Sequence, residues 1–593
     1  MGLCLLPLCN SVQAQNIEGE LKLWHKLTLI FEGPATSEQA EENPFLEYRL
    51  NVVFTHKATQ QKLLVPGYYA ADGNAANSGS DMGNIWKVHF APSKKGEWMY
   101  EVDFKKGKWA AVRTSNKLKS GQFMDGLKGT FSIGESDKKG SDLRGKGMLS
   151  YNGERYLQFA NGEYFLKCGS DAPENFLAYN KFDGTFHNDG HKDDLVKTWE
   201  AHRNDWKEGD PTWKNGKGKE IIGAINYLAS KGMNAFSFLT MNIAGDDQNV
   251  FPYVDYDTWD RFDCSKLDQW EILFEHADKI GMFLHFKTLE HENQGLLDNG
   301  GTGLYTKLYY RELIARFGHH LAMNWNLAEE TGDWTETPPT FPLDVHERIR
   351  LAEYISATDP YKHHLVIHNG DWYSGIYGPN TKFTGASLQT DMEDFSHVHS
   401  QVLKVLKEAK ETGKVWAVAV DEPGDHRHSL IPDSENPDHN NARKNGLWGA
   451  MMAGAWGTEW YFGYEHPHSD LSCQDFRSRD LFWDQGRFCL EFFKKNNIPV
   501  WKMVSSDQLI SSKDDYVLAE EGKSYVVFLK NGGESILDLG TTNAEYRVMW
   551  YDPRKGGDLR MGKVKTISGS GKQSLGYPPN KKNKDWVVLV RKI

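Results

Sequence analysis

The chain has 593 residues, more than one hydrophobic core supports, so we expect two to four domains. Its formal net charge of −12 argues against a nucleic-acid partner, because binding to phosphates requires a basic surface. Aromatic residues make up 13% of the chain, including 20 Trp and 25 Tyr, and rings beyond those that packing needs can serve as stacking platforms for sugars.

The first residues are typical of a secretory signal. An apolar run is followed by Val12-Gln13-Ala14, an A-x-A-like cleavage site, although the basic segment that begins such signals is missing. We therefore expect residues 1–14 to be a truncated signal peptide and the protein to be secreted, periplasmic or on the cell surface. No later stretch is apolar enough to span a membrane. The four remaining cysteines show no metal-ligand spacing, and they leave room for one disulfide whose pairing the sequence does not give.

Residues 15–136 show the pattern of short strands and turns. Residues 21–30, 48–54 and 86–90 alternate apolar and polar side chains, and glycines separate them. Several short strands in little more than a hundred residues predict an antiparallel, immunoglobulin-like β-sandwich.

A set of motifs in this segment resembles an uncharacterised N-terminal sandwich domain. That domain usually precedes glycoside hydrolases in bacteria that degrade polysaccharides, so the resemblance implies such an enzyme downstream. The motifs are Trp24-His-Lys26, Phe31-Glu-Gly-Pro34, Asn43-Pro-Phe-Leu46, Val65-Pro-Gly-Tyr68, Ala71-Asp-Gly73 and Gly96-Glu-Trp98.

After a charged linker, strand-like and helix-like patterns alternate through residues 148–496. Eight short apolar runs are separated by segments with helical spacing of apolar residues, which predicts a (β/α)8 TIM barrel. The predicted strands are residues 164–170, 234–240, 282–287, 323–330, 365–369, 386–390, 415–422 and 457–463. By this count the run from Met323 is the fourth strand and the run from Val415 is the seventh.

Residues 497–593 return to alternating strands at 525–529, 546–550 and 586–590, which predicts a second, C-terminal β-sandwich. The motif Trp550-Tyr-Asp-Pro-Arg554 resembles the signature of a C-terminal domain, sometimes called collagen-binding, that is found behind this type of barrel. The label is a family name and does not identify collagen as the ligand.

Two of the barrel strands end in adjacent acidic residues. The fourth ends in Glu329 and Glu330, and the seventh ends in Asp421 and Glu422. The carboxyl ends of barrel strands meet at one rim, where the active sites of this fold lie. Paired carboxyl groups about 5–5.5 Å apart serve retaining glycosidases, and separations of about 6.5–9.5 Å serve inverting ones.

A second resemblance implies a role for each of these acids. Leu327-Ala-Glu-Glu330 resembles the Leu-Ala-Asn-Glu strand end of the large retaining glycosidase clan, which implies that Glu330 is the acid/base. Glu329 stands where that clan has Asn, so it binds a sugar hydroxyl or, with the register shifted by one, is itself the acid. Val420-Asp-Glu-Pro423 resembles the Ser-Glu-Pro strand end of apiosidase-type barrels, which implies that Glu422 is the nucleophile and that Asp421 orients it or holds a hydroxyl.

Other strand ends carry polar and aromatic residues that we nominate for substrate binding. The alternative for each is a hydrogen-bonded or core position without substrate contact. The polar candidates are Asn242, His285, Lys287, His368, Gln389 and Asp391, and the aromatic ones, nominated for stacking, are Trp372, Tyr373, Trp460 and Tyr461.

The leading hypothesis is a secreted retaining glycoside hydrolase that acts on a plant or algal polysaccharide or oligosaccharide without a metal or cofactor. A carbohydrate-binding or adhesion protein and a polysaccharide lyase are the alternatives. Glu290-His-Glu292 and Asp425-His-Arg-His428 lack the spacing of a known metal motif. Neither a phosphate loop nor a G-x-S-x-G elbow occurs, so the sequence does not support a nucleotide enzyme or an esterase.

Overall fold

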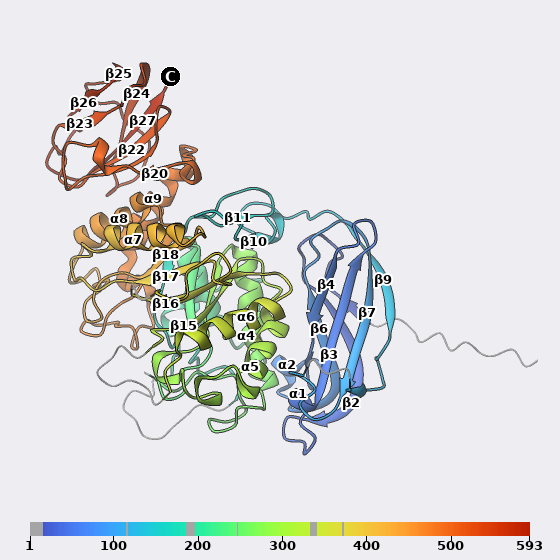
Figure 1. Ribbon diagram of the computed structural model, residues 1–593. Coiled ribbons are helices and arrows are strands. Elements are labelled where there is room, and N and C mark those ends of the chain that lie inside the picture. Colours follow the sequence, from blue (N-terminus) through green and yellow to red (C-terminus); the bar gives the residue numbers. More distant parts are fainter. Residues whose placement is uncertain (1–15, 114–116, 185–195, 246, 333–340, 371–372) are drawn as a thin grey trace, which may run out of the picture.

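The computed structural model describes residues 16–113, 117–184, 196–245, 247–332, 341–370 and 373–593 (Figure 1). A closed parallel barrel lies between two β-domains, one formed by the N-terminal part of the chain and one by the C-terminal part. The predicted fold class, a (β/α)8 barrel flanked by two antiparallel β-domains, is confirmed. The predicted signal peptide at residues 1–14 lies outside the described residues.

The N-terminal domain consists of two antiparallel sheets packed face to face. One has the order β1-β2-β6-β5, and the other has the order β4-β3-β7-β8 with β9 on β7. Stacked rings of Phe54 and Phe90, with centroids 4.0 Å apart, join the two sheets in the core. The strands are β1 (Asn16–Glu18), β2 (Leu27–Ser37), β3 (Tyr48–His56), β4 (Lys62–Pro66), β5 (Tyr68–Tyr69), β6 (Met82–Phe90), β7 (Gly96–Lys106), β8 (Lys119–Ser120) and β9 (Lys128–Ile133).

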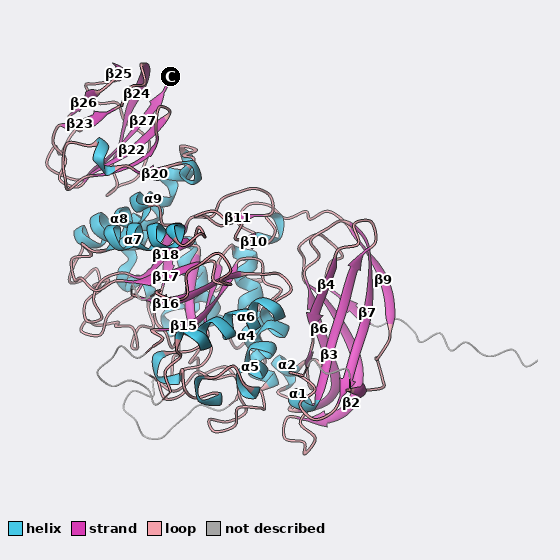
Figure 2. Ribbon diagram, viewed as in Figure 1, coloured by secondary structure: helices cyan, strands magenta, loops and turns pink. Residues whose placement is uncertain are grey.

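The barrel closes in chain order from β12 to β19. Figure 2 shows four of its strands, β15 to β18, beside the helices that surround it. Its strands are buried on both faces, which is why they read as continuous apolar runs in the sequence. They are β12 (Lys167–Ser170), β13 (Ala235–Leu239), β14 (Phe283–Lys287), β15 (Met323–Glu329), β16 (His364–Asn369), β17 (Gly385–Gln389), β18 (Ala417–Glu422) and β19 (Gly457–Trp460). The strands that end in paired acids, β15 and β18, are the fourth and the seventh, as predicted.

Helices surround the barrel and are bounded by local signals in the sequence. In α4, Asp263 caps the first turn by accepting a hydrogen bond from the Lys266 amide, and Gly281 ends the helix with a φ of 88°. The helices are α3 (Lys219–Ser230), α4 (Cys264–Ile280), α5 (Leu304–Phe317), α6 (Val345–Thr358), α7 (Val398–Glu411), α8 (Trp448–Ala453) and α9 (Asp480–Lys495), with short α1 (Pro44–Glu47) and α2 (Ala75–Ser78) in the N-terminal domain and the hairpin β10 (Leu149–Ser150) and β11 (Gln158–Phe159) ahead of the barrel. Among the described residues, no helix combines the length and apolarity needed to cross a membrane.

The C-terminal domain has a core of its own, built around Trp550 and Trp586. A six-stranded sheet of order β20-β21-β22-β27-β24-β25 packs with the pair β23-β26. The strands are β20 (Val504–Ser505), β21 (Tyr516–Glu520), β22 (Ser524–Leu529), β23 (Ser535–Asp538), β24 (Ala544–Tyr551), β25 (Thr566–Gly569), β26 (Lys572–Gly576) and β27 (Trp586–Lys592).

Both β-domains dock on the barrel through buried polar contacts. On the N-terminal side, Arg316 of α5 donates a 3.0 Å hydrogen bond to the Tyr69 carbonyl. On the C-terminal side, the guanidinium of Arg443 binds both carboxylate oxygens of Asp585 at 2.8 and 3.2 Å. The bidentate pair of Arg443 and Asp585 fixes the orientation of the C-terminal domain as well as adding energy.

Candidate active site

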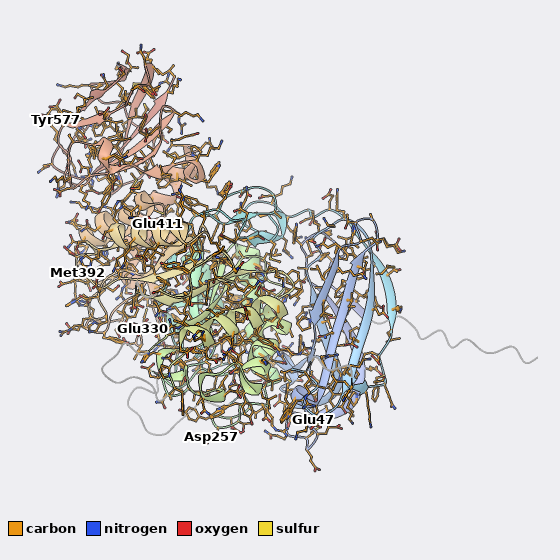
Figure 3. The ribbon with its side chains drawn as sticks, in the orientation of Figure 1. Glu47, Asp257, Glu330, Met392, Glu411 and Tyr577 are labelled. Atoms are coloured by element: carbon orange, nitrogen blue, oxygen red, sulfur yellow. The ribbon has the colours of Figure 1, made fainter. Side chains whose placement is uncertain are left out.

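Glu330 leaves the barrel wall immediately after β15. The pairing of β15 with β16 shifts register between Asn326 and Glu329, and Glu330 then adopts a φ of 51°, in the left-handed region. Bulges and strained residues of this kind cluster at functional sites, because they re-aim a side chain. Figure 3 shows Glu330 on the side of the barrel away from the N-terminal domain.

Gln389, the last residue of β17, connects Glu330 with Glu422. Its Nε2 amide donates to Glu330 Oε1 at 2.5 Å and to Glu422 Oε1 at 3.2 Å. The two carboxylate oxygens are therefore no further apart than the sum of these distances, 5.7 Å. The structure brings together the acids that end the fourth and seventh strands.

The environment of Glu330 favours its protonated form. Burial and the nearby Glu422 carboxylate raise the pKa of Glu330 to about 8, against the opposing hydrogen bond from Gln389. A carboxyl group with this pKa carries a proton at neutral pH and is able to donate it.

Glu422 has a different environment, because it is oriented by a histidine. His368 of β16 is fully buried and its Nε2 donates to Glu422 Oε2 at 2.9 Å, while its Nδ1 lies 2.9 Å from Ser387 Oγ. Burial and Lys287 oppose protonation of His368, but Glu422 and Glu329 outweigh them and raise its pKa. The His368 ring therefore donates to one oxygen of the Glu422 carboxylate, while Gln389 donates to the other.

Glu329 points into a buried ionic network. Its Oε1 lies 2.6 Å from Lys287 Nζ, which also contacts Asp171 at 2.9 Å. Although burial raises the pKa of Glu329, Lys287 and His368 outweigh burial and lower it below the ordinary value. Of the two adjacent acids, Glu329 is held ionised and Glu330 is held protonated.

Four residues nominated for the substrate have their contacts with other protein groups. Asp421 forms a 2.5 Å ion pair with Lys167, and His285 Nδ1 is 2.5 Å from Glu459 Oε2, all beneath the cavity. Asn242 accepts a hydrogen bond from the Val250 amide and so closes its own loop. Lys287, as described above, has its contacts in the same interior. None of these four side chains is among the residues that line the cavity described below.

The aromatic nominations divide in a similar way. Tyr373 and Trp460 are completely buried, the former against Trp416 and the latter against Phe482, so neither offers a ring face to a sugar. Tyr461 borders the cavity, and Trp372 lies outside the described residues. A ring that the sequence reading missed, Tyr464, also borders the cavity and is 45% exposed.

A cavity of about 530 Å³ opens above these acids. Half of its sixteen lining residues are acidic, and none of the described ones is Lys or Arg. The lining residues are Glu174, Glu290, His291, Glu292, Glu329, Glu330, Gly370, Gln389, Thr390, Asp391, Gln401, Glu422, Asp425, His426, Tyr461 and Tyr464. Glu174, a buried acid that interacts with Glu329, was missed, although its place in the loop after the first barrel strand is a signal that could have found it.

Within the described residues, two buried groups of carboxylates and histidine inside the barrel have ligand atoms near enough to surround an ion: Asp171, His285, Glu459 and Glu329, His368, Glu422. Lysine ammonium groups already neutralise both, with Lys167 3.3 Å from Glu459 and Lys287 2.6 Å from Glu329. The arrangement fits acid/base and nucleophilic chemistry by carboxyl groups.

Comparison with known families accounts for both flanking domains. Residues 20–105 match the family described as "Domain of unknown function (DUF5060)", and residues 498–591 match "Putative collagen-binding domain of a collagenase". No curated protein matches the chain.

Two solved structures with a similar fold are described as glycoside hydrolases. One described as a putative glycoside hydrolase from Bacteroides vulgatus ATCC 8482 aligns over 96% of this chain and 99% of its own, with a TM-score of 0.61 and 15% identity. A glycoside hydrolase family 5 structure from the same organism aligns over 77% of this chain and 95% of its own, with a TM-score of 0.52 and 14% identity. The chain thus shares its three-part architecture and its barrel fold with solved glycoside hydrolases.

Proposed function

We propose that the chain is a retaining glycoside hydrolase with Glu422 as nucleophile and Glu330 as acid/base. The observation that carries this proposal is the contact of one Gln389 amide with both carboxyl groups, which limits the separation of their facing oxygens to 5.7 Å. This limit agrees with the spacing of about 5–5.5 Å in retaining enzymes and is shorter than the spacing of about 6.5–9.5 Å that admits a water in inverting ones.

In the first step Glu422 attacks the anomeric carbon, and the glycosidic C–O bond breaks as Glu330 gives its proton to the leaving oxygen. The raised pKa of Glu330 supports this role, because the group must be protonated before it acts. In the second step Glu330, now ionised, takes a proton from water, and the resulting hydroxide displaces Glu422 from the sugar. Two inversions return the anomeric carbon to its original configuration.

The charge of the cavity supports a neutral sugar at the reacting centre. Its described lining contains eight acidic residues and no Lys or Arg, so a sulfate or uronate group would meet like charge at short range. The same lining disfavours a polysaccharide lyase, because that chemistry needs a cationic partner for the substrate carboxylate. Hydroxyl groups of a neutral sugar can donate to these carboxylates, and Tyr464 offers an exposed ring for stacking.

We further propose that the substrate is a plant or algal polysaccharide or oligosaccharide and that the protein acts outside the cytoplasm, as its N-terminal sequence predicts. A panel of neutral, uronic and sulfated glycans, with products followed by chromatography, tests this proposal. Release of sugars from neutral glycans only is the expected result. Activity restricted to sulfated or uronic glycans would contradict the proposed substrate class, and binding without turnover across the panel would contradict the hydrolase assignment.

A further inference from the structure

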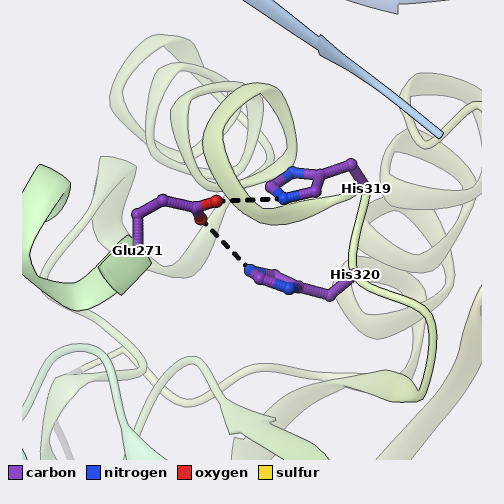
Figure 4. A group of neighbouring side chains, drawn as sticks. All are labelled: Glu271, His319 and His320. Atoms are coloured by element: carbon purple, nitrogen blue, oxygen red, sulfur yellow. Dashed lines mark hydrogen bonds and ion pairs between the residues drawn. The ribbon is translucent and has the colours of Figure 1, made fainter. Parts of the chain in front are cut away.

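A separate cluster of histidine and carboxylate side chains lies at the other end of the barrel. Glu271 comes from α4, and His319 and His320 come from the segment between α5 and β15 (Figure 4). This segment enters β15 at its N-terminal end, whereas Glu330 follows the C-terminal end of the same strand. The cluster therefore lies across the barrel from the catalytic cavity, on the face where this fold places structural features.

The spacing of the three side chains resembles the edge of a metal tetrahedron. The Oε1 of Glu271 lies 3.0 Å from His319 Nε2, and its Oε2 lies 3.1 Å from His320 Nε2. Ligand atoms bound at about 2.0–2.1 Å in tetrahedral geometry are roughly 3.3 Å apart. Each oxygen of Glu271 is directed toward one imidazole in Figure 4, so only small adjustments would surround an ion.

His319 gives an independent indication of a missing ligand. It is only 4% exposed, yet neither ring nitrogen meets the geometry of a hydrogen bond with a described residue, and Nε2 has only the 3.0 Å ion-pair contact with Glu271. Buried polar atoms nearly always have a partner, and those without one require an explanation. A bound metal ion would supply that partner to Nε2.

Two further side chains support the cluster as they would support metal ligands. His320 Nδ1 lies 2.8 Å from Asp278 Oδ2, the carboxylate–histidine arrangement that directs Nε2 toward an ion. Lys26, directly before β2 of the N-terminal domain, contacts Glu271 Oε1 at 2.9 Å and Glu275 at 2.9 Å. With Oε1 held by Lys26, Oε2 remains available for coordination through one oxygen.

We propose that Glu271, His319 and His320 form a binding site for a divalent transition-metal ion, with Zn²⁺ as the preferred ion. Two imidazoles and one carboxylate suit this ion and leave a fourth position for water. A cavity of about 330 Å³, bordered by His319, Asp278 and Lys26, adjoins the cluster and gives an entry path.

The test is Zn²⁺ titration of the full-length protein after removal of metal with a chelator, followed by calorimetry and thermal unfolding. We expect one equivalent to bind and to raise the Tm of the wild type. His319→Gln and Glu271→Gln should weaken binding by at least about 100-fold, because loss of a direct ligand exceeds the 10–100-fold cost of losing a supporting residue. His276→Gln is the matched control, since His276 is a buried histidine of the same helix that is hydrogen-bonded to Asn226 instead.

Two outcomes would overturn the site: no saturable binding to the wild type, or equal affinity in wild type and His319→Gln. Glu422→Gln should bind Zn²⁺ as the wild type does, and loss of binding there would place the ion in the catalytic cavity instead. If the cluster variants fail to fold, anomalous diffraction from wild-type crystals soaked in Zn²⁺ decides the question. A peak between Glu271, His319 and His320 supports the proposal, and its absence contradicts it.

Discussion

His368 Nε2 lies 2.9 Å from Glu422 Oε2, a contact that joins the end of β16 to the end of β18 across the intervening β17. With Gln389 on the other oxygen, the carboxylate of Glu422 is held at both ends. A nucleophile that is fixed in this way needs no reorganisation before it attacks, which is the advantage that preorganised sites have over water.

Replacement of this histidine should slow turnover without weakening substrate binding. In His368→Gln the amide cannot reproduce the ring's simultaneous contacts with Glu422 and Ser387, and a misplaced nucleophile costs up to about 100-fold in rate. We expect kcat to fall with KM nearly unchanged in steady-state assays. His364→Gln, a buried histidine at the far end of the same strand, is the control, and an equal loss of kcat there would indicate a merely structural role.

The two proposed catalytic acids should respond differently to the leaving group. Glu330→Gln should lose about 10²–10⁴-fold of its rate on substrates with poor leaving groups and far less on dinitrophenyl glycosides, which depart without protonation. Glu422→Gln should lose activity on both kinds of substrate, because no covalent intermediate forms. Kinetics on the two substrate series measures this difference, with Glu353→Gln, at an exposed position of α6 outside the cavity lining, as the control. Activity of Glu422→Gln near that of the wild type would exclude it as the nucleophile.

The pH dependence should follow the protonation of Glu330. The pKa of Glu330 is raised to about 8, so kcat/KM should fall as the pH rises through that value, and the fall should be absent in Glu330→Gln. The free energy of unfolding should also fall as the pH rises, because the folded chain binds this proton more tightly than the unfolded chain does. The wild type should therefore lose stability relative to Glu330→Gln between about pH 4.5 and 8. Denaturant titrations of the pair at several pH values measure this loss, and a constant difference would contradict the raised pKa.

The sequence predicts that the acids lie together, because apolar runs that end in acids are typical of barrel strands, whose carboxyl ends meet at one rim. The positions of Glu330 and Glu422 could be predicted in this way. The direction in which each neighbouring acid points could not be predicted. Because the strands are buried on both faces, their periodicity does not show whether a side chain points into the barrel interior or into the cavity. Asp421 and Glu329 therefore turned out to pair with Lys167 and Lys287.

Of the aromatic nominations, Tyr461 borders the cavity, whereas its neighbour Trp460 is buried in the core. Trp460 and Tyr461 are adjacent, and the sequence does not say which of the two turns into the core. Glu290, Asp425 and Tyr464, which also line the cavity, lie on loops. The course of these loops depends on tertiary contacts and not on any local sequence pattern.

The interior lysine should be a major determinant of stability. Lys287→Met would leave Glu329 and Asp171 as buried carboxylates without their cation, and breaking a buried pair costs about 3–5 kcal/mol of unfolding free energy. Lys57→Met, which removes an exposed partner of Glu97, should change stability by less than about 1 kcal/mol. Urea unfolding of both variants measures the contrast, and equal small losses would show that the barrel interior is solvated.

The most direct test of the account is to hydrolyse a substrate of known anomeric configuration and to observe, by NMR, the anomeric proton of the sugar product as it first forms. The separation of at most 5.7 Å between Glu330 and Glu422 oxygens leads us to predict that the product appears with the configuration of the substrate before mutarotation. Initial release of the inverted anomer would contradict the double displacement and remove the nucleophile role from Glu422.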